Sequence, residues 1–297
     1  MQSVAIITDS SADIPPELAE KNEITIIPMY LSIEGKSYRE GMDIKPEQVF
    51  AALNSGIRVT TSAPPPGDFI KIFKDLLDKK KKQFVYYIGL SSKLSGILNS
   101  AYAASKQFEE GEIKIFDSKT STINLGQIVL ETARALKKEI DLDKLDLLIQ
   151  ELIDNSRFSA TLESMEHVFK GGRAKFFAKF LSSSIIFKPI LTIGRDGKVK
   201  LKKFAKNNKT AIFELINQAK KELMILKEKG YKKCYLGIFY GSDKKPALQI
   251  EKSLKQDLEL KEIIDETIIT EITAIISAHT GPGIWGVATT PKIEYLK

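Results

Sequence analysis

Four short apolar runs in the first half of the chain alternate with helical patterns. The runs are rich in β-branched residues and do not alternate polar with apolar, as strands buried on both faces should read. Residues 67–81, between two of the runs, place Phe69, Ile70, Phe73 and Leu76 on one helical face. This order predicts a mainly parallel sheet with helices on both sides. The four runs are VAIITD, EITIIPMYL, KQFVYYIGL and EIKIFDS.

The second half has more strand patterns and fewer helical ones. Arg195-Asp196-Gly197 separates two apolar runs and predicts a β-hairpin. Residues 209–229 carry one long apolar stripe that ends at Gly230, which predicts a helix. The expected strands are FSATLES, IFKPILTI, KVKLKKFA, KKCYLGIFY and ETIITEIT, with WGVATT the least distinct.

A chain of 297 residues is longer than one core usually supports, so two domains are expected. We therefore predict an α/β protein in two parts. Residues 1–156 form a parallel-sheet domain that carries the Ser- and Thr-rich loops. Residues 157–297 form a second α/β domain with a mixed or antiparallel sheet.

The composition is that of a soluble globular protein, with 43% hydrophobic and 28% charged residues. The N-terminal run has no basic start, and no run of about 18 apolar residues occurs, so neither a signal peptide nor a membrane span is expected. The one cysteine, Cys234, cannot form an internal disulfide, which indicates a reducing cytoplasm. Its apolar neighbours predict a packed, inert thiol.

The net charge of +7 is spread over helix faces and ends. Because the lysines do not form a stripe interleaved with aromatic residues, we do not expect nucleic-acid binding. A basic surface suits an acidic protein partner, an anionic ligand or transient contact with a membrane surface. One cysteine, two distant histidines and no acidic ladder with ligand spacing predict no metal site.

Hydroxyl-bearing or small residues follow predicted strands in four loops. The carboxyl ends of parallel strands lie along one sheet edge, and ligands bind in that crevice. The alternative is that each Ser or Thr caps the helix that follows. One capping residue per helix would suffice, so the presence of several hydroxyl-bearing residues in each loop favours a ligand site. The loops are TDSSADIP (8–15), TTSAPPPGDF (60–69), GLSSKLSG (89–96) and DSKTST (117–122).

Ser95, in the third of these loops, has three possible roles: nucleophile, anion ligand or helix cap. The chain lacks the hydrolase elbow G-x-S-x-G, the phosphate loop G-x-x-x-x-G-K-[ST] and the pattern S-x-x-K at Lys93. A triad of Ser95, His279 and Asp9 stays open, because the sequence neither demands nor excludes it.

Two further motifs carry polar residues that suit a binding site. His279 lies in SAHTGPGIWG, where glycines bracket a proline in a tight turn whose N–H groups can converge on an anion. Arg173 follows two glycines in FKGGRAKF and is either a solvated residue after a helix or a guanidinium that reaches the crevice. His167 is interpreted as structural or surface.

Eight motifs, in order and nearly end to end, together resemble the DegV family of bacterial lipid-binding proteins. The resemblance implies a two-domain α/β protein that binds one long-chain fatty acid in a tunnel between the domains, with no other cofactor. It also implies a fatty-acid kinase partner that phosphorylates the carboxylate, while the protein itself is not the phosphotransferase and carries the acyl-phosphate onward. The motifs are IITDSSADIP, YREGMDIKPEQVF, TTSAPPPGDF, GLSSKLSGILNSA, FDSKTST, FKGGRAKF, FKPILTIGRDGKV and AHTGPGIWGV.

The same resemblance implies the site residues. Arg173 would support the carboxylate end of the site. Lys206 stands where the family has an arginine tied to the kinase surface, and a lysine lacks the planar fork of arginine. Ile97 replaces a frequent threonine, and Ala174 replaces the usual isoleucine. The implied carboxylate contacts are Thr61 or Ser62, Ser95 with Gly96, and His279 with Thr280.

Elementary energetics agree with a lipid role. Burying about fourteen methylenes contributes on the order of 10 kcal/mol before ordering costs. A carboxylate removed from water needs donors or takes up a proton, and Ser95, Thr61, His279 and the N–H of Gly96 are suitable donors. We therefore predict that Ser95 binds an anion. The alternatives are a serine hydrolase of acyl esters that uses Ser95 and His279, and a nucleic-acid or regulatory module.

Overall fold

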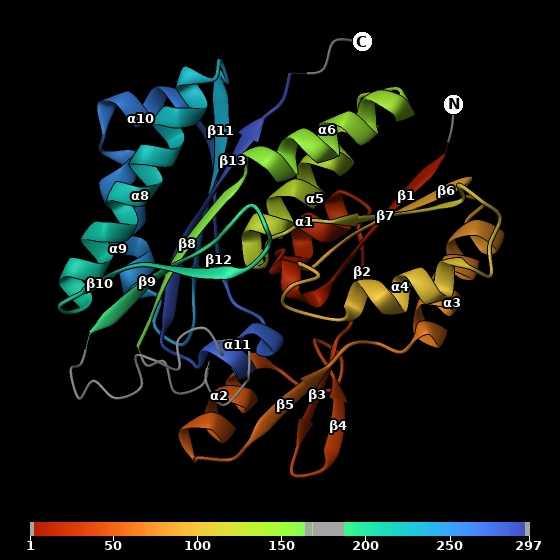
Figure 1. Cartoon of the computed structure of the whole chain (residues 1–297), viewed down its shortest axis with the longest axis horizontal. Helices are drawn as coiled ribbons and strands as arrows, with labels where there is room; N and C mark the ends of the chain where they lie inside the picture. The colour runs from red at the N-terminus through yellow and green to blue at the C-terminus, as the bar shows by residue number, and fades with distance from the viewer. Residues whose placement is uncertain (1–2, 164–167, 169–186, 295–297) are drawn as a thin grey trace.

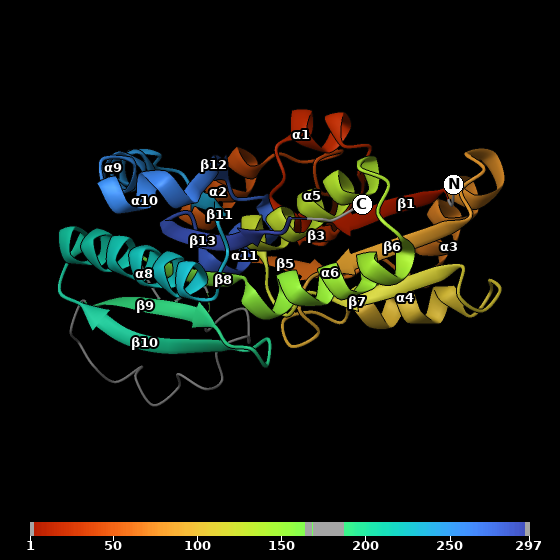
Figure 2. The same cartoon turned by 90° about the horizontal axis from the view of Figure 1, so that it is seen from above.

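The computed structural model describes residues 3–163, 168 and 187–294. These residues form three β-sheets with helices between and around them (Figures 1 and 2). One hydrophobic cluster runs through the molecule and contains Ile7 and Ile88 from the first sheet and Ile284 from the last strand. The two halves of the chain therefore share a core.

The first sheet has four strands, all parallel, in the order β2-β1-β6-β7. Val85, Tyr86, Tyr87 and Ile88 of β6 all have 0% exposure, so this strand is buried on both faces, as its unalternating run predicts. The strands are β1 (Val4–Asp9), β2 (Thr25–Ile27), β6 (Phe84–Gly89) and β7 (Ile113–Asp117).

A second, three-stranded antiparallel sheet in the order β4-β3-β5 was not predicted. The run EITIIPMYL divides between two sheets, because Pro28 follows β2 and has no N–H to continue a ladder. Thr61 and Ser62, predicted in a loop, lie on a strand of this sheet. Its strands are β3 (Tyr30–Ile33), β4 (Lys36–Arg39) and β5 (Val59–Ser62).

The third sheet has six strands in the order β10-β9-β8-β13-β11-β12, with β11 and β12 parallel and all other pairs antiparallel. Every strand predicted in the second half forms, and WGVATT belongs to β13 in the middle of the sheet. The sheet begins at Arg157, while the division into two domains there stays a prediction. The strands are β8 (Arg157–Leu162), β9 (Lys188–Ile193), β10 (Val199–Ala205), β11 (Lys233–Tyr240), β12 (Ile264–Glu271) and β13 (Ile284–Lys292).

The predicted hairpin joins β9 to β10. Gly197 has a φ of 75°, the left-handed conformation that a glycine adopts without steric cost. Ser91 Oγ donates a hydrogen bond of 2.9 Å to the Gly197 carbonyl, so the hairpin turn also contacts the loop that follows β6.

Helix α5 (Thr122–Lys137) lies between the first and third sheets, where it contacts β1 and β6 on one side and β11 and β13 on the other (Figure 1). Two of its buried polar side chains are paired across the contact with the third sheet. Asn124 Nδ2 donates to Thr290 Oγ1 at 3.2 Å, and Tyr235 OH donates to Glu131 Oε2 at 2.5 Å. A helix buried on all sides needs such pairing, because unpaired buried polar groups are costly.

The other helices cover the outer faces and edges of the sheets. The long helix predicted over 209–229 contacts β8, β9, β10 and β13. The helix predicted over 67–81 ends as α-helix at Lys74 and continues as one π-helical turn, η2 (Asp75–Lys79). The helices are α1 (Pro16–Lys21), α2 (Pro46–Asn54), α3 (Pro66–Lys74), α4 (Ile97–Ser105), α6 (Leu142–Asn155), α8 (Asn208–Glu228), α9 (Lys245–Lys255), α10 (Leu258–Ile263) and α11 (Ala274–Thr280).

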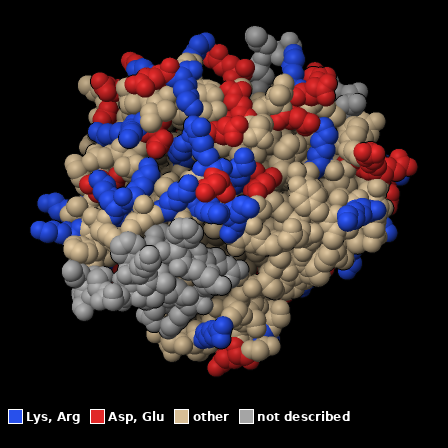
Figure 3. Space-filling view, in the orientation of Figure 1, with Lys and Arg blue, Asp and Glu red and all other residues tan. Residues whose placement is uncertain are grey.

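The surface charge and the character of the helices both bear on the expected partners. On the face shown in Figure 3, Lys and Arg side chains are intermixed with Asp and Glu, in agreement with a diffuse positive charge. Within the ranges that the structure describes, a helix with the length and apolar character of a membrane span was searched for and not found.

Gly126 of α5 gives a first test of the packing. A Cβ at this position would lie 2.5 Å from the carbonyl oxygen of Ala12, which belongs to the short helix η1 (Ser10–Ala12). Because a backbone oxygen cannot rotate away, we expect Gly126→Ala to lower the free energy of unfolding by about 2–3 kcal/mol. Urea denaturation measures this change.

Gly67 of α3 is the matched control, since a Cβ there meets nothing within 4 Å. Gly67→Ala should leave the free energy of unfolding unchanged or raise it by up to about 1 kcal/mol, as alanine is the better helix former. Similar behaviour of the two variants would contradict the close approach of α5 to η1.

Candidate functional site

A cavity lies between the carboxyl edge of the parallel sheet and the six-stranded sheet. Its empty volume is about 840 Å³ including the opening to solvent. Residues that follow β2, β6 and β7 all reach it, as the edge rule predicts. Met29 follows β2, Leu90 and Ser95 follow β6, and Ser121 follows β7.

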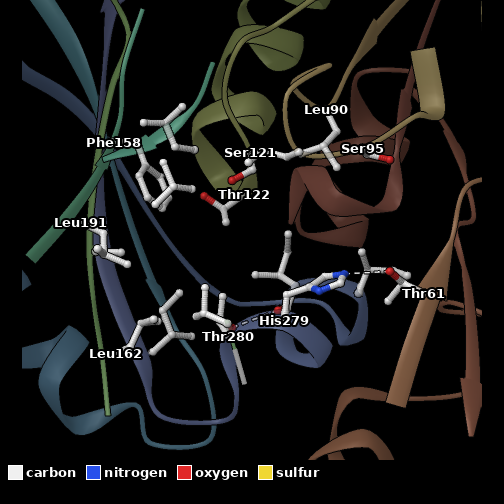
Figure 4. Close-up of a pocket in the computed structure, with 18 of the residues that line it drawn as sticks. Thr61, Leu90, Ser95, Ser121, Thr122, Phe158, Leu162, Leu191, His279 and Thr280 are labelled. Carbon is white, nitrogen blue, oxygen red and sulfur yellow. Dashed lines mark hydrogen bonds between the residues drawn. The ribbon is translucent and has the colours of Figure 1, made fainter. Parts of the chain in front are cut away.

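One wall of the cavity is apolar. It is formed by strands of the third sheet, and Figure 4 shows Phe158, Leu162 and Leu191 together on this side. Thirteen of the nineteen described lining residues are hydrophobic, and none of the described ones is Lys, Arg, Asp or Glu. The wall therefore suits an alkyl chain better than a charged or sugar-like ligand.

Thr61 and Ser95 lie on the side of the cavity opposite Phe158 and Leu191, with His279 between the two sides (Figure 4). Thr61 on β5 and His279 on α11 are joined by a hydrogen bond of 2.7 Å between Thr61 Oγ1 and His279 Nε2. Thr280, the last residue of α11, also lines the cavity, and its hydroxyl donates to the Ile276 carbonyl at 3.0 Å. Ser95 lines the cavity from the loop before α4.

Ser95 accepts a hydrogen bond from the start of a helix and lines the cavity at the same time. Its Oγ accepts a hydrogen bond of 3.2 Å from the N–H of Ile97, in the first turn of α4. A hydroxyl that accepts one hydrogen bond keeps its own proton to donate. The cap reading and the ligand reading of Ser95 are therefore compatible.

Two buried carboxyl groups hold the N-terminal end of α11. Both oxygens of Glu40 accept from the Ile275 N–H at 3.3 Å, and Asp13 Oδ1 accepts from the Thr273 N–H at 2.9 Å. Burial raises the pKa of Glu40 to about 7 and raises the pKa of Asp13 well above its ordinary value. These groups position the helix that carries His279, and no sequence motif distinguishes them from other carboxylates of the chain.

The triad considered from the sequence does not assemble around Asp9. This residue is fully buried, and its Oδ1 accepts from the N–H and hydroxyl of Ser11. Its Oδ2 accepts from Tyr87 OH and from the Leu90 N–H, both at 2.9 Å. With both oxygens engaged in the loop structure, Asp9 does not orient His279 as a general base.

Comparison with known proteins agrees with this architecture. A family model described as "Uncharacterised protein, DegV family" matches residues 3–292. The chain belongs to the DegV family. It is 30% identical, over 287 residues, to a DegV domain-containing protein of Caldanaerobacter subterraneus subsp. tengcongensis, an alignment that covers 97% of this chain and 98% of the relative.

Solved DegV structures have the same fold. A DegV family protein from Thermus thermophilus, described as fatty acid binding, superposes with a TM-score of 0.89 at 25% identity and covers 98% of this chain and 100% of its own. A stearic acid-binding protein from Eubacterium ventriosum superposes with a TM-score of 0.84 at 22% identity, covering 98% of this chain and 99% of its own. The predicted α/β fold class is thus confirmed.

The structure brings some of the predicted DegV site residues together and leaves others apart. Thr61, Ser95, His279 and Thr280 line one cavity. Ser62 is exposed, because successive side chains on a strand point to opposite faces, and it does not line the cavity. Gly96 is also exposed, at the N-cap of α4.

Lys206 and Cys234 of this DegV chain do not line the cavity. Lys206 is exposed in the turn between β10 and α8. Arg173, Ala174 and His167 lie outside the described residues. Cys234 is the packed thiol that the sequence predicts, and burial raises its pKa to about 12.

Ser121 and Thr122 line the cavity but were not among the predicted site residues. The signal was present, because they end the loop DSKTST, one of the four that follow predicted strands. A Ser-Thr pair at the start of a helix is most simply interpreted as a helix cap. Only its position beside the cavity distinguishes a ligand contact from a cap.

Proposed function

We propose that this protein binds one long-chain fatty acid in a tunnel between its two halves. The acyl chain would lie against β8, β9 and β10, and the carboxylate would lie near Thr61, Ser95 and His279. The observation that carries the proposal is the single cavity wall of aliphatic and aromatic side chains facing a cluster of uncharged donors. The fatty-acid binding described for the related Thermus protein supports it.

The donors suit a carboxylate that must stay accessible. When His279 Nε2 carries a proton, it donates a hydrogen bond to Thr61 Oγ1, and the O–H of Thr61 is then available to donate to the ligand. Ser95 adds a second hydroxyl. Ser62, Gly96 and Thr280 remain proposed carboxylate contacts, and Arg173 remains a proposed supporting residue.

We further propose that the protein is a carrier without catalytic activity of its own. A fatty-acid kinase partner would transfer a phosphoryl group from a nucleoside triphosphate to a carboxylate oxygen, leaving an acyl-phosphate and a nucleoside diphosphate. The exposed position of Lys206 supports a docking role for this residue. The single buried cysteine supports a cytoplasmic location.

Native mass spectrometry before and after organic extraction tests the binding proposal. The untreated protein should exceed its 33.2 kDa by the mass of one fatty acid, and extraction should remove the excess. A delipidated protein that takes up no fatty acid would refute the proposal. If the loaded protein binds lipid but a fatty-acid kinase with nucleotide forms no acyl-phosphate on it, only the partner role fails.

Ser95→Ala separates the two roles of this hydroxyl. We expect the binding free energy of the fatty acid to weaken by about 1–2 kcal/mol. The free energy of unfolding should fall by about 1 kcal/mol, because the hydrogen bond to the Ile97 N–H is lost. Isothermal titration and thermal unfolding measure the two effects. Ser92→Ala, on an exposed neighbour, should change neither.

Two results would contradict this assignment of Ser95. Unchanged affinity with reduced stability would show a cap alone. Labelling of Ser95 by a fluorophosphonate probe would show an activated nucleophile and would favour a hydrolase.

A further inference from the structure

Helix α5 begins at the cavity wall. Its N-cap residue, Ser121, and its first residue, Thr122, both line the cavity, and Figure 4 shows them between Phe158 and Ser95. The first N–H groups of a helix have no acceptor within the helix, and this end carries partial positive charge. Ser121 does not use its side chain to cap them.

Thr122 supplies an independent sign of a ligand site. The residue is 1% exposed, and its buried Oγ1 has no hydrogen-bond partner among the described residues. Its φ of 54° lies in the left-handed region, which is unusual for a β-branched residue and is strained. Strain of this kind is often retained where a side chain must be presented to a ligand.

Neighbouring hydroxyls of the same loop are satisfied within the protein. Ser118 Oγ donates to the Thr120 carbonyl at 3.3 Å, and Thr120 Oγ1 donates to Asn124 Oδ1 at 2.8 Å. These two hydroxyls of the loop are therefore paired within the protein, whereas the Thr122 hydroxyl at the cavity is not. A hydrogen-bond donor or acceptor on a ligand would satisfy it.

The donors proposed for the carboxylate come from β5, α11 and the loop before α4. Ser121 and Thr122 lie between Ser95 and the apolar wall (Figure 4). A saturated acyl chain that passes them has no atom that can form a hydrogen bond with their hydroxyl groups. We propose that Ser121 and Thr122 form a second polar subsite for an oxygen atom on the acyl chain, so that the preferred ligands are hydroxy or oxo fatty acids. This inference rests on the proposed fatty-acid binding and specifies its substrate class.

Binding of octadecanoic acid and of its mono-hydroxy positional isomers to delipidated full-length protein tests the inference. At least one isomer should bind about tenfold more tightly than the unsubstituted acid, the effect of one additional hydrogen bond. Thr122→Val should reduce this ratio to about one. Ser121→Ala, which does not alter the strained position, is a second variant and should also reduce it. Thr60→Val, on an exposed residue of β5, should leave the ratio as in the wild type.

The other outcomes overturn the inference in distinguishable ways. If no isomer binds more tightly than octadecanoic acid, the subsite does not exist and fatty-acid binding stands. If Thr122→Val weakens all the acids equally, Thr122 belongs to the carboxylate site instead. If the wild-type protein binds none of the acids, the proposed function fails as well.

Discussion

Ala160→Phe is expected to abolish fatty-acid binding while the protein stays folded. Ala160 lies on β8, is 2% exposed and lines the cavity from its apolar side. A phenyl ring there would enter the cavity and occupy space that the acyl chain needs. Displacing about five methylenes removes about 4 kcal/mol of binding free energy, a loss of affinity on the order of a thousandfold.

The free energy of unfolding of the same variant should rise although its affinity for fatty acids falls. Filling an apolar cavity commonly raises the free energy of unfolding by about 0.5–2 kcal/mol. Fluorescent fatty-acid displacement and thermal unfolding measure the two quantities on one sample. Ala103→Phe, on the exposed side of α4, is the control for added aromatic surface and should retain binding. Wild-type affinity in Ala160→Phe would show that the acyl chain lies elsewhere.

Glu40→Gln is expected to stabilise the protein above neutral pH and to have little effect in acid. The pKa of Glu40 is about 7 in the folded protein, because burial disfavours its charge, against an ordinary value of 4.5. Between these two pH values the folded state keeps a proton that the unfolded state has lost. Wild-type stability therefore falls as pH rises through this window, by about 3 kcal/mol in total at about 1.36 kcal/mol per pH unit.

Glutamine resembles the protonated carboxyl group and does not titrate, and its carbonyl can still accept from the Ile275 N–H. The variant should therefore exceed the wild type by about 3 kcal/mol at about pH 8 and match it near pH 4.5. Urea denaturation across this range measures the difference. Asp9, which raises the pKa of Glu40 further, and Asp13 are present in both proteins. Because the charge of Glu40 in turn raises the pKa of Asp13, the difference reports Glu40 together with its coupling to Asp13. Glu20→Gln, on an exposed residue of α1, should show no such dependence, and a parallel shift at all pH values would disprove the assigned pKa.

Much of the fold follows from local patterns. The unalternating runs became strands of the parallel sheet, and the Arg195-Asp196-Gly197 turn became the hairpin between β9 and β10. The long stripe over 209–229 became α8, Asn208–Glu228. These elements were predictable because apolar periodicity and turn chemistry act over a few residues. The small sheet of β3, β4 and β5 was not, because its strands pair only after Pro28 redirects the chain.

The site was predictable in part for the same reason. Residues after parallel strands converge at one sheet edge, so the placement of Ser95 beside the cavity follows from the order of strands. Which of Thr61 and Ser62 lines the cavity depends on which face of β5 meets α11. Whether Ser121 and Thr122 line the cavity depends on where the first turn of α5 lies relative to the third sheet. Neither orientation has a local signal in the sequence.

The amino-acid sequence by itself determined the order and type of most strands and helices, the loops that carry hydroxyl groups, and the membership of a family. Only the tertiary structure decided which of those groups meet. Thr61 and His279 are 218 positions apart, and Asp13 and Thr273 are 260 apart, yet each pair forms a hydrogen bond. Contacts at such separations, and the burial that raises the pKa of Glu40, arise from the packing of the two halves around α5, which no short stretch of sequence encodes.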